Sequence, residues 1–170
     1  MAHAAAVEAS GGGIFAKMKG AERARGIRAD DARTLTISHK RRKDRTMILT
    51  LIHVALGGAI GASLRYLVQL GTLRLFGSGF PYGTLAVNVA GSFAMGVLVV
   101  VLAEKAGMRL APFVLTGMLG GFTTFSTFSL DAVTLWERGQ SWMSLGYVGV
   151  SILFSLAALV VGLQLARSLI

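Results

Sequence analysis

GMLGGFTTFSTFS, at residues 117–129, lies inside a charge-free run of 21 residues, 110–130, which is long enough to cross a bilayer as one helix. It is nevertheless a poor membrane helix, because it contains three glycines and because five hydroxyl side chains fall between residues 123 and 129. Interrupted, polar backbone at membrane depth is tolerated where protein buries it or a wet cavity receives it. We therefore expect a helix that is broken at mid-membrane beside an ion site. For any single Ser or Thr, close helix packing is the alternative.

The composition is typical of a membrane protein. Of 170 residues, 54% are hydrophobic and only 15% are charged. The chain has no cysteine, which excludes disulfides and thiolate metal sites, and it carries no zinc-protease, phosphate-loop or dinucleotide motif. The net charge of +9 does not indicate a nucleic-acid partner, because residues 1–46 hold 11 of the 17 basic residues and five of the eight acidic ones.

The sequence divides into a basic N-terminal extension and a membrane domain. Residues 1–46 show no sustained apolar period, so we expect them to be disordered. They end in KRRKDR at residues 40–45, which could bind anionic headgroups or open a signal peptide. We favour a third interpretation, in which translation begins at Met47 and the extension reflects a mis-assigned start. Residues 47–170 predict an all-α, multi-pass protein of the cell membrane with four transmembrane helices, at about 47–76, 82–103, 110–136 and 141–166.

The charges flanking these four segments give almost no preferred orientation. Without the extension, one side of the membrane carries three basic residues and the other side two, a weak bias under the positive-inside rule. The extension changes this count to 14 against two, with the N-terminus inside. Four helices are few for enclosing a polar pathway, so we expect an oligomer. For an ambiguous orientation, an antiparallel (dual-topology) pair with a two-fold axis in the membrane plane is a natural solution. Small residues four apart, such as Gly57 and Gly61, Ala86 and Ala90, or Gly117 and Gly121, indicate packing faces.

Three motifs make residues 47 to about 166 resemble the CrcB/Fluc family of fluoride channels. They are GGAIGASLRY at residues 57–66, GTLAVNVAGSF at residues 83–93 and GGFTTFSTFS at residues 120–129. The resemblance implies a fluoride-selective channel, not an enzyme, that lowers cytoplasmic fluoride by passive efflux. It also implies an antiparallel homodimer with two separate anion pathways.

A structural sodium ion at the dimer axis belongs to the same resemblance. By position, its ligands would be the backbone carbonyls of Gly120 and Thr123. Glycines free carbonyls from helical bonding, and hard oxygen ligands suit a small alkali cation. A simple packing kink is the alternative.

The fluoride pathway, in the same resemblance, would run past aromatic edges and a series of hydrogen-bond donors. Phenylalanine rings are positive at the edge, so they can approach a partly dehydrated anion without trapping it. Ordinary core packing is the alternative for the rings, and interhelical hydrogen bonding is the alternative for the amide. The expected pathway residues are Asn88, Phe125, Thr127, Phe128, Tyr147, Ser151 and Ser155.

The remaining polar residues of the membrane domain leave two further functions open. Arg65 could draw anions into a vestibule or pair with Asp131, and snorkelling is its alternative. Asp131 stands where the family is expected to have Glu, and it is the carboxylate that a proton-coupled exporter of cations would need. The chain could also be one half of a heterodimeric channel, its partner a homologous subunit. His53 is expected to be a packed residue.

Overall fold

The computed structural model of the chain describes Gly20, residues 43–106 and residues 108–170. The chain divides into two units, Met1–Ile48 and Leu49–Ile170. The prediction of disorder for the N-terminal extension lies mostly outside the described residues. Residues 43–48, which are described, are helical. Within the described residues the first span therefore already includes Lys43, ahead of the predicted Met47.

The described part of the chain is helical and contains no strand. Four helical stretches are long and apolar enough to cross a membrane, which agrees with the predicted all-α membrane protein of four transmembrane helices. Their bounds are Lys43–Phe76, Tyr82–Lys105, Met108–Glu137 and Ser141–Leu169. We refer to them as the first to fourth spans.

The helical geometry changes along the second and third spans but not along the fourth. The second span consists of α2 (Tyr82–Val101) and the π-helical η1 (Leu102–Ala106), and the fourth span is the single helix α5 (Ser141–Leu169). Four pieces make up the third span: η2 (Met108–Leu110), the π-helical η3 (Pro112–Leu119), α3 (Gly120–Phe122) and α4 (Phe125–Glu137).

Two residues of extended backbone separate α3 from α4. Thr123 has φ −82° and ψ 160°, and Thr124 has φ −152° and ψ 122°. Both are β-branched residues, which favour extended backbone over helix. The side chain of Thr124 then caps α4 by accepting a hydrogen bond from the Thr127 N–H, so the second helix can restart at once.

Glycines bring the first and third spans into backbone contact. A Cβ atom added at Gly57 would meet Phe113 O, and one added at Gly61 would meet Met118 O. On the facing helix, Cβ atoms added at Gly117 and Gly121 would meet Val54 O and Gly58 O, each at 2.7 Å. The predicted packing role of these two glycine pairs is therefore confirmed. The predicted packing role of Ala86 and Ala90 is not seen within this single chain, because both residues are exposed.

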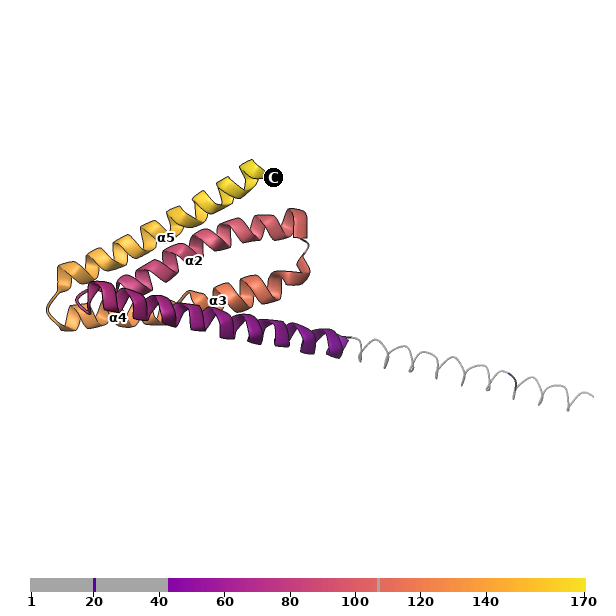
Figure 1. Cartoon of the computed structure of the whole chain (residues 1–170), viewed down its shortest axis with the longest axis horizontal. Helices are drawn as coiled ribbons and strands as arrows, with labels where there is room; N and C mark the ends of the chain where they lie inside the picture. The colour runs from indigo at the N-terminus through magenta and orange to yellow at the C-terminus, as the bar shows by residue number, and fades with distance from the viewer. Residues whose placement is uncertain (1–19, 21–42, 107) are drawn as a thin grey trace, which may run out of the picture. The chain divides into compact units, whose positions relative to one another are not determined.

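Helices α2 and α5 lie side by side and run in the same direction (Figure 1). Toward one end Phe80, just before α2, packs its ring edge-on against Tyr147 of α5, with 5.5 Å between centroids. Toward the other end Gly96 and Gly162 meet at backbone distance. The second and fourth spans therefore end on the same side of the bundle.

Candidate functional site

Asn88 of α2 binds the backbone at the interruption between α3 and α4. Its Oδ1 accepts a hydrogen bond of 2.8 Å from the Thr124 N–H, and its Nδ2 donates one of 2.9 Å to the Thr124 carbonyl. The amide thus satisfies both polar groups of a peptide unit that has left the helix. Asn88 therefore forms the interhelical hydrogen bonds that were the alternative to a pathway role. These bonds use only one of its two Nδ2–H donors.

The backbone carbonyls of Gly120 and Thr123 lose their helical donors at the same place. In a continuous α-helix the Gly120 carbonyl would accept from the Thr124 N–H, and the Thr123 carbonyl from the Thr127 N–H. Instead, the Thr124 N–H donates to Asn88, and the Thr127 N–H donates to the Thr124 hydroxyl at 3.1 Å. These are the two carbonyls that the family resemblance implies as metal ligands. Gly120 is exposed in the single chain.

A pocket of about 340 Å³ opens directly beside the interruption. It brings together five of the seven predicted pathway residues, Asn88, Phe125, Phe128, Ser151 and Ser155, with Ser92, Thr123, Thr124, Ile152 and Leu156. We call it the Asn88 pocket. Six of its ten lining residues carry a hydroxyl or an amide group, but most of the surface that they expose to the pocket is apolar, which is the usual make-up of a site that binds a small ligand.

Ser151 is the most informative of these residues. Its side chain is buried, and its Oγ has no hydrogen-bond partner among the residues that the structure describes. A buried hydroxyl normally finds a partner, because leaving one unsatisfied costs about 1–3 kcal/mol. Because Ser151 also lines the Asn88 pocket, its hydroxyl is available to a ligand there.

An aromatic row leads away from this pocket. Phe125 and Phe128 have ring centroids 5.5 Å apart, and Phe128 lies 5.4 Å from Tyr147. Phe125 is 79% exposed, so it is not a core residue of the single chain, whereas Tyr147 is fully buried. Core packing therefore does not explain Phe125.

A second pocket, of about 270 Å³, lies on the other side of the aromatic row and contains Thr127. We call it the Asp131 pocket, since the Asp131 carboxylate lines it together with Thr84, Gln69 and Arg138. Asp131 Oδ2 accepts a 2.6 Å hydrogen bond from the Thr84 hydroxyl and a 3.4 Å hydrogen bond from the Tyr147 hydroxyl. Thr84 lies in the second motif but was not expected to have a role; its contact with Asp131, 47 residues away, reveals one.

The predicted pathway residues thus fall on two pockets rather than on one continuous lining. Thr127 faces the Asp131 pocket, whereas its neighbour Phe128 faces the Asn88 pocket. Tyr147 stands between them, with its ring against Phe128 and its hydroxyl on Asp131.

The structure does not support the Arg65–Asp131 ion pair or the packing of His53. Arg65 is half-buried, but in the described part of the chain it forms no ion pair with Asp131, whose Oδ2 is taken by Thr84 and Tyr147. The expectation that His53 is packed is wrong. Its ring is exposed, and Nδ1 lies 2.6 Å from the Leu49 carbonyl one turn earlier, which satisfies the ring within its own helix.

Comparison with known proteins shows a family match and several relatives of this chain. Residues 52–163 match the family model described as CrcB-like protein, Camphor Resistance (CrcB). Several relatives, including the following three, carry the name Fluoride-specific ion channel FluC. The one from Cereibacter sphaeroides is 64% identical over 121 residues, covering 71% of this chain and 97% of the relative. Those from Paracoccus denitrificans and Mesorhizobium japonicum are 57% and 50% identical, covering 71% and 72% of this chain and 96% and 99% of the relatives.

Proposed function

This chain belongs to the CrcB-like protein family, as its three motifs predicted, and we propose that it is a fluoride-selective ion channel. It lowers cytoplasmic fluoride by passive efflux across the cell membrane, which its four spans cross. Nothing in this function requires a covalent step, so the residues of the two pockets act by hydrogen bonding and electrostatics alone.

The observation that carries the proposal is the Ser151 hydroxyl in the Asn88 pocket, which has no hydrogen-bond partner in the described part of the chain. Fluoride is strongly hydrated, and a pathway must replace the lost water with donors. The Ser151 hydroxyl and the second Nδ2–H of Asn88 are donors of this kind. The positive edges of Phe125 and Phe128, on the same pocket, complete a lining that attracts an anion without a fixed positive charge.

From this pocket, fluoride passes the aromatic row to reach the Asp131 pocket. Tyr147 and Thr127 supply hydroxyls at the crossing, and Ser155 extends the donors along α5 in the opposite direction. The Asp131 carboxylate holds the Thr84 and Tyr147 hydroxyls, so an arriving anion must compete with it for them. Arg65 contributes the positive charge of a vestibule.

The carbonyls of Gly120 and Thr123 would hold the structural sodium ion. They fit a hard alkali cation, since both are neutral oxygen ligands whose helical donors are engaged by Asn88 and Thr124. The ion would supply positive charge at the interruption, which we place at mid-membrane. At the interruption one chain offers these two carbonyls, and a two-fold axis would double them.

The second copy is antiparallel. Apolar and small residues that a soluble core would bury are exposed near the interruption, including Gly120, Phe125, Ala86 and Ala90. The nearly balanced charges of the membrane domain allow both orientations. If the basic extension is present, it favours one orientation, and the partner is then a homologous subunit with the opposite bias.

A proton-coupled cation exporter is the rival function, and Asp131 is its one candidate coupling group in the membrane domain. The test is efflux from proteoliposomes that contain the purified protein, followed with a fluoride electrode and with chloride as the control anion. We expect fluoride efflux without chloride efflux. Proton-driven uptake of a fluorescent cation that Asp131→Asn abolishes, with no fluoride efflux, would establish the rival.

A further inference from the structure

A third pocket, far from the interruption, lies between the ends of α2 and α5. The two helices are in backbone contact at Gly96 and Gly162, so they cannot separate there. One to two turns further on, a pocket of about 450 Å³ opens between them. Val99, Val100 and Leu163 form part of its apolar wall, and we call it the Glu104 pocket.

The mouth of this pocket carries one acidic and one basic side chain. Glu104 lies in η1, and Arg167 lies in the last turn of α5; both are exposed. Within residues 43–106 and 108–170, the structure gives neither side chain an ion pair or a hydrogen bond. A π-helical turn such as η1 is frequently found at functional sites.

The position of the Glu104 pocket limits the kind of molecule that can bind in it. The second and fourth spans run in the same direction, so Glu104 and Arg167 stand at the same membrane surface, each near the end of its span. Below them the wall is apolar, and it lies alongside two segments that are apolar enough to cross the bilayer. A molecule that fills the pocket must therefore combine an apolar chain with a head group that carries both a negative and a positive charge.

We propose that the Glu104 pocket binds a phospholipid whose head group contains a phosphate and a primary ammonium, as in phosphatidylethanolamine. Arg167 binds the phosphate with its planar guanidinium, and Glu104 accepts hydrogen bonds from the ammonium. The acyl chain lies along Val99, Val100 and Leu163. An anionic head group without an ammonium would leave the Glu104 carboxylate beside negative charge, and a quaternary ammonium offers it no N–H donor.

The test is native mass spectrometry of the purified dimer in detergent, with phosphatidylethanolamine, phosphatidylglycerol and phosphatidylcholine of identical acyl chains. We expect phosphatidylethanolamine to bind most tightly. Glu104→Gln should remove its preference over phosphatidylcholine. Arg167→Gln should weaken all three lipids about tenfold, which corresponds to roughly 1.4 kcal/mol, while Arg167→Lys should retain most of the binding.

The matched control is Arg74→Gln, an exposed arginine near the end of the first span and outside the three pockets, which should leave lipid binding unchanged. Equal binding of the three lipids, or an unchanged preference in Glu104→Gln, would overturn the proposal. So would lipid binding to the monomer but not to the dimer, because a second copy would then be the occupant. None of these readings depends on fluoride flux, so the proposed channel function stands or falls separately.

Discussion

Asn88 of α2 and Thr124 of the third span are joined by two hydrogen bonds, one to the Thr124 N–H at 2.8 Å and one to its carbonyl at 2.9 Å. The pair replaces the helical bonds that the interrupted backbone has lost. The same amide lines the pocket in which we place fluoride, so a change at Asn88 affects stability and transport together.

Asn88→Asp tests this double role. The carboxylate keeps the acceptor for the Thr124 N–H but places a second oxygen against the Thr124 carbonyl, and it adds negative charge to the pathway. We expect a loss of about 1–3 kcal/mol in stability and a fall in fluoride efflux of at least about tenfold. Thermal unfolding and electrode-monitored efflux measure the two effects, and cross-linking should still show dimers. Normal efflux in a destabilised Asp variant would remove Asn88 from the pathway.

Ser151→Ala should lower fluoride transport without lowering stability, whereas Asn88→Asp lowers both. Because the Ser151 hydroxyl is buried without a partner among the described residues, its removal should leave the melting temperature unchanged or raise it. Fluoride efflux should nevertheless fall by about tenfold, since hydrogen bonds to charged groups are worth roughly 1.5–3 kcal/mol. The control is Ser144→Ala, a buried serine that donates to the Ala132 carbonyl at 2.7 Å. That variant should lose stability and keep its efflux.

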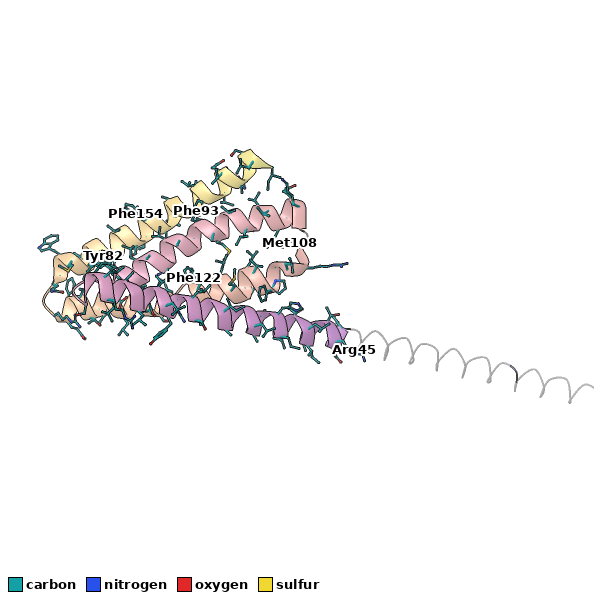
Figure 2. The ribbon with its side chains drawn as sticks, in the orientation of Figure 1. Arg45, Tyr82, Phe93, Met108, Phe122 and Phe154 are labelled. Carbon is teal, nitrogen blue, oxygen red and sulfur yellow. The ribbon has the colours of Figure 1, made fainter. Side chains whose placement is uncertain are left out.

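Phe125→Ile tests the aromatic edge. Phe125 is 79% exposed in the single chain, so isoleucine should cost little folding stability, while fluoride efflux falls by about tenfold because the positive ring edge is lost. Phe154 on α5 provides the control (Figure 2), since it is 59% exposed and lines none of the three pockets described above. Equal losses of efflux in Phe125→Ile and Phe154→Ile would show a general effect on the membrane domain instead.

Two adjacent glycines distinguish packing within the chain from contact between copies. A Cβ atom at Gly121 would lie 2.7 Å from Gly58 O, so Gly121→Ala should cost about 1–3 kcal/mol in stability. A Cβ atom at Gly120 meets nothing closer than Leu115 O at 3.8 Å, and the residue has ordinary helical dihedrals. Gly120→Ala should therefore fold normally but weaken dimerisation, as measured by single-molecule photobleaching in lipid. A fully dimeric Gly120→Ala protein would contradict the proposed axis.

The membrane spans could be predicted because they depend on local composition. Long charge-free runs bounded by charged or glycine-rich connections define a helix without knowledge of its neighbours, and the four predicted spans differ from the structure by only a few residues at their ends. The unusual density of glycine and hydroxyl groups at residues 117–129 led us to expect an interruption there, and the extended backbone of Thr123 and Thr124 lies within this stretch.

The interior of the site could not be predicted in the same way, because it depends on contacts distant in sequence. Asn88 and Thr124 are 36 residues apart, and Thr84 and Asp131 are 47 apart. No periodicity reveals such pairs. The division of the pathway residues between two pockets follows from the packing of Phe128 on Tyr147, which sequence spacing did not indicate.

The two bonds from Asn88 also bear on biogenesis. A nascent subunit that enters the lipid alone must not leave a bare peptide group in hydrocarbon, where an unsatisfied polar group costs several kcal/mol. The Asn88 amide that satisfies the Thr124 peptide group belongs to the same chain. A single protomer can therefore complete its folding in the bilayer before it meets a second copy. Assembly then follows insertion instead of having to accompany it.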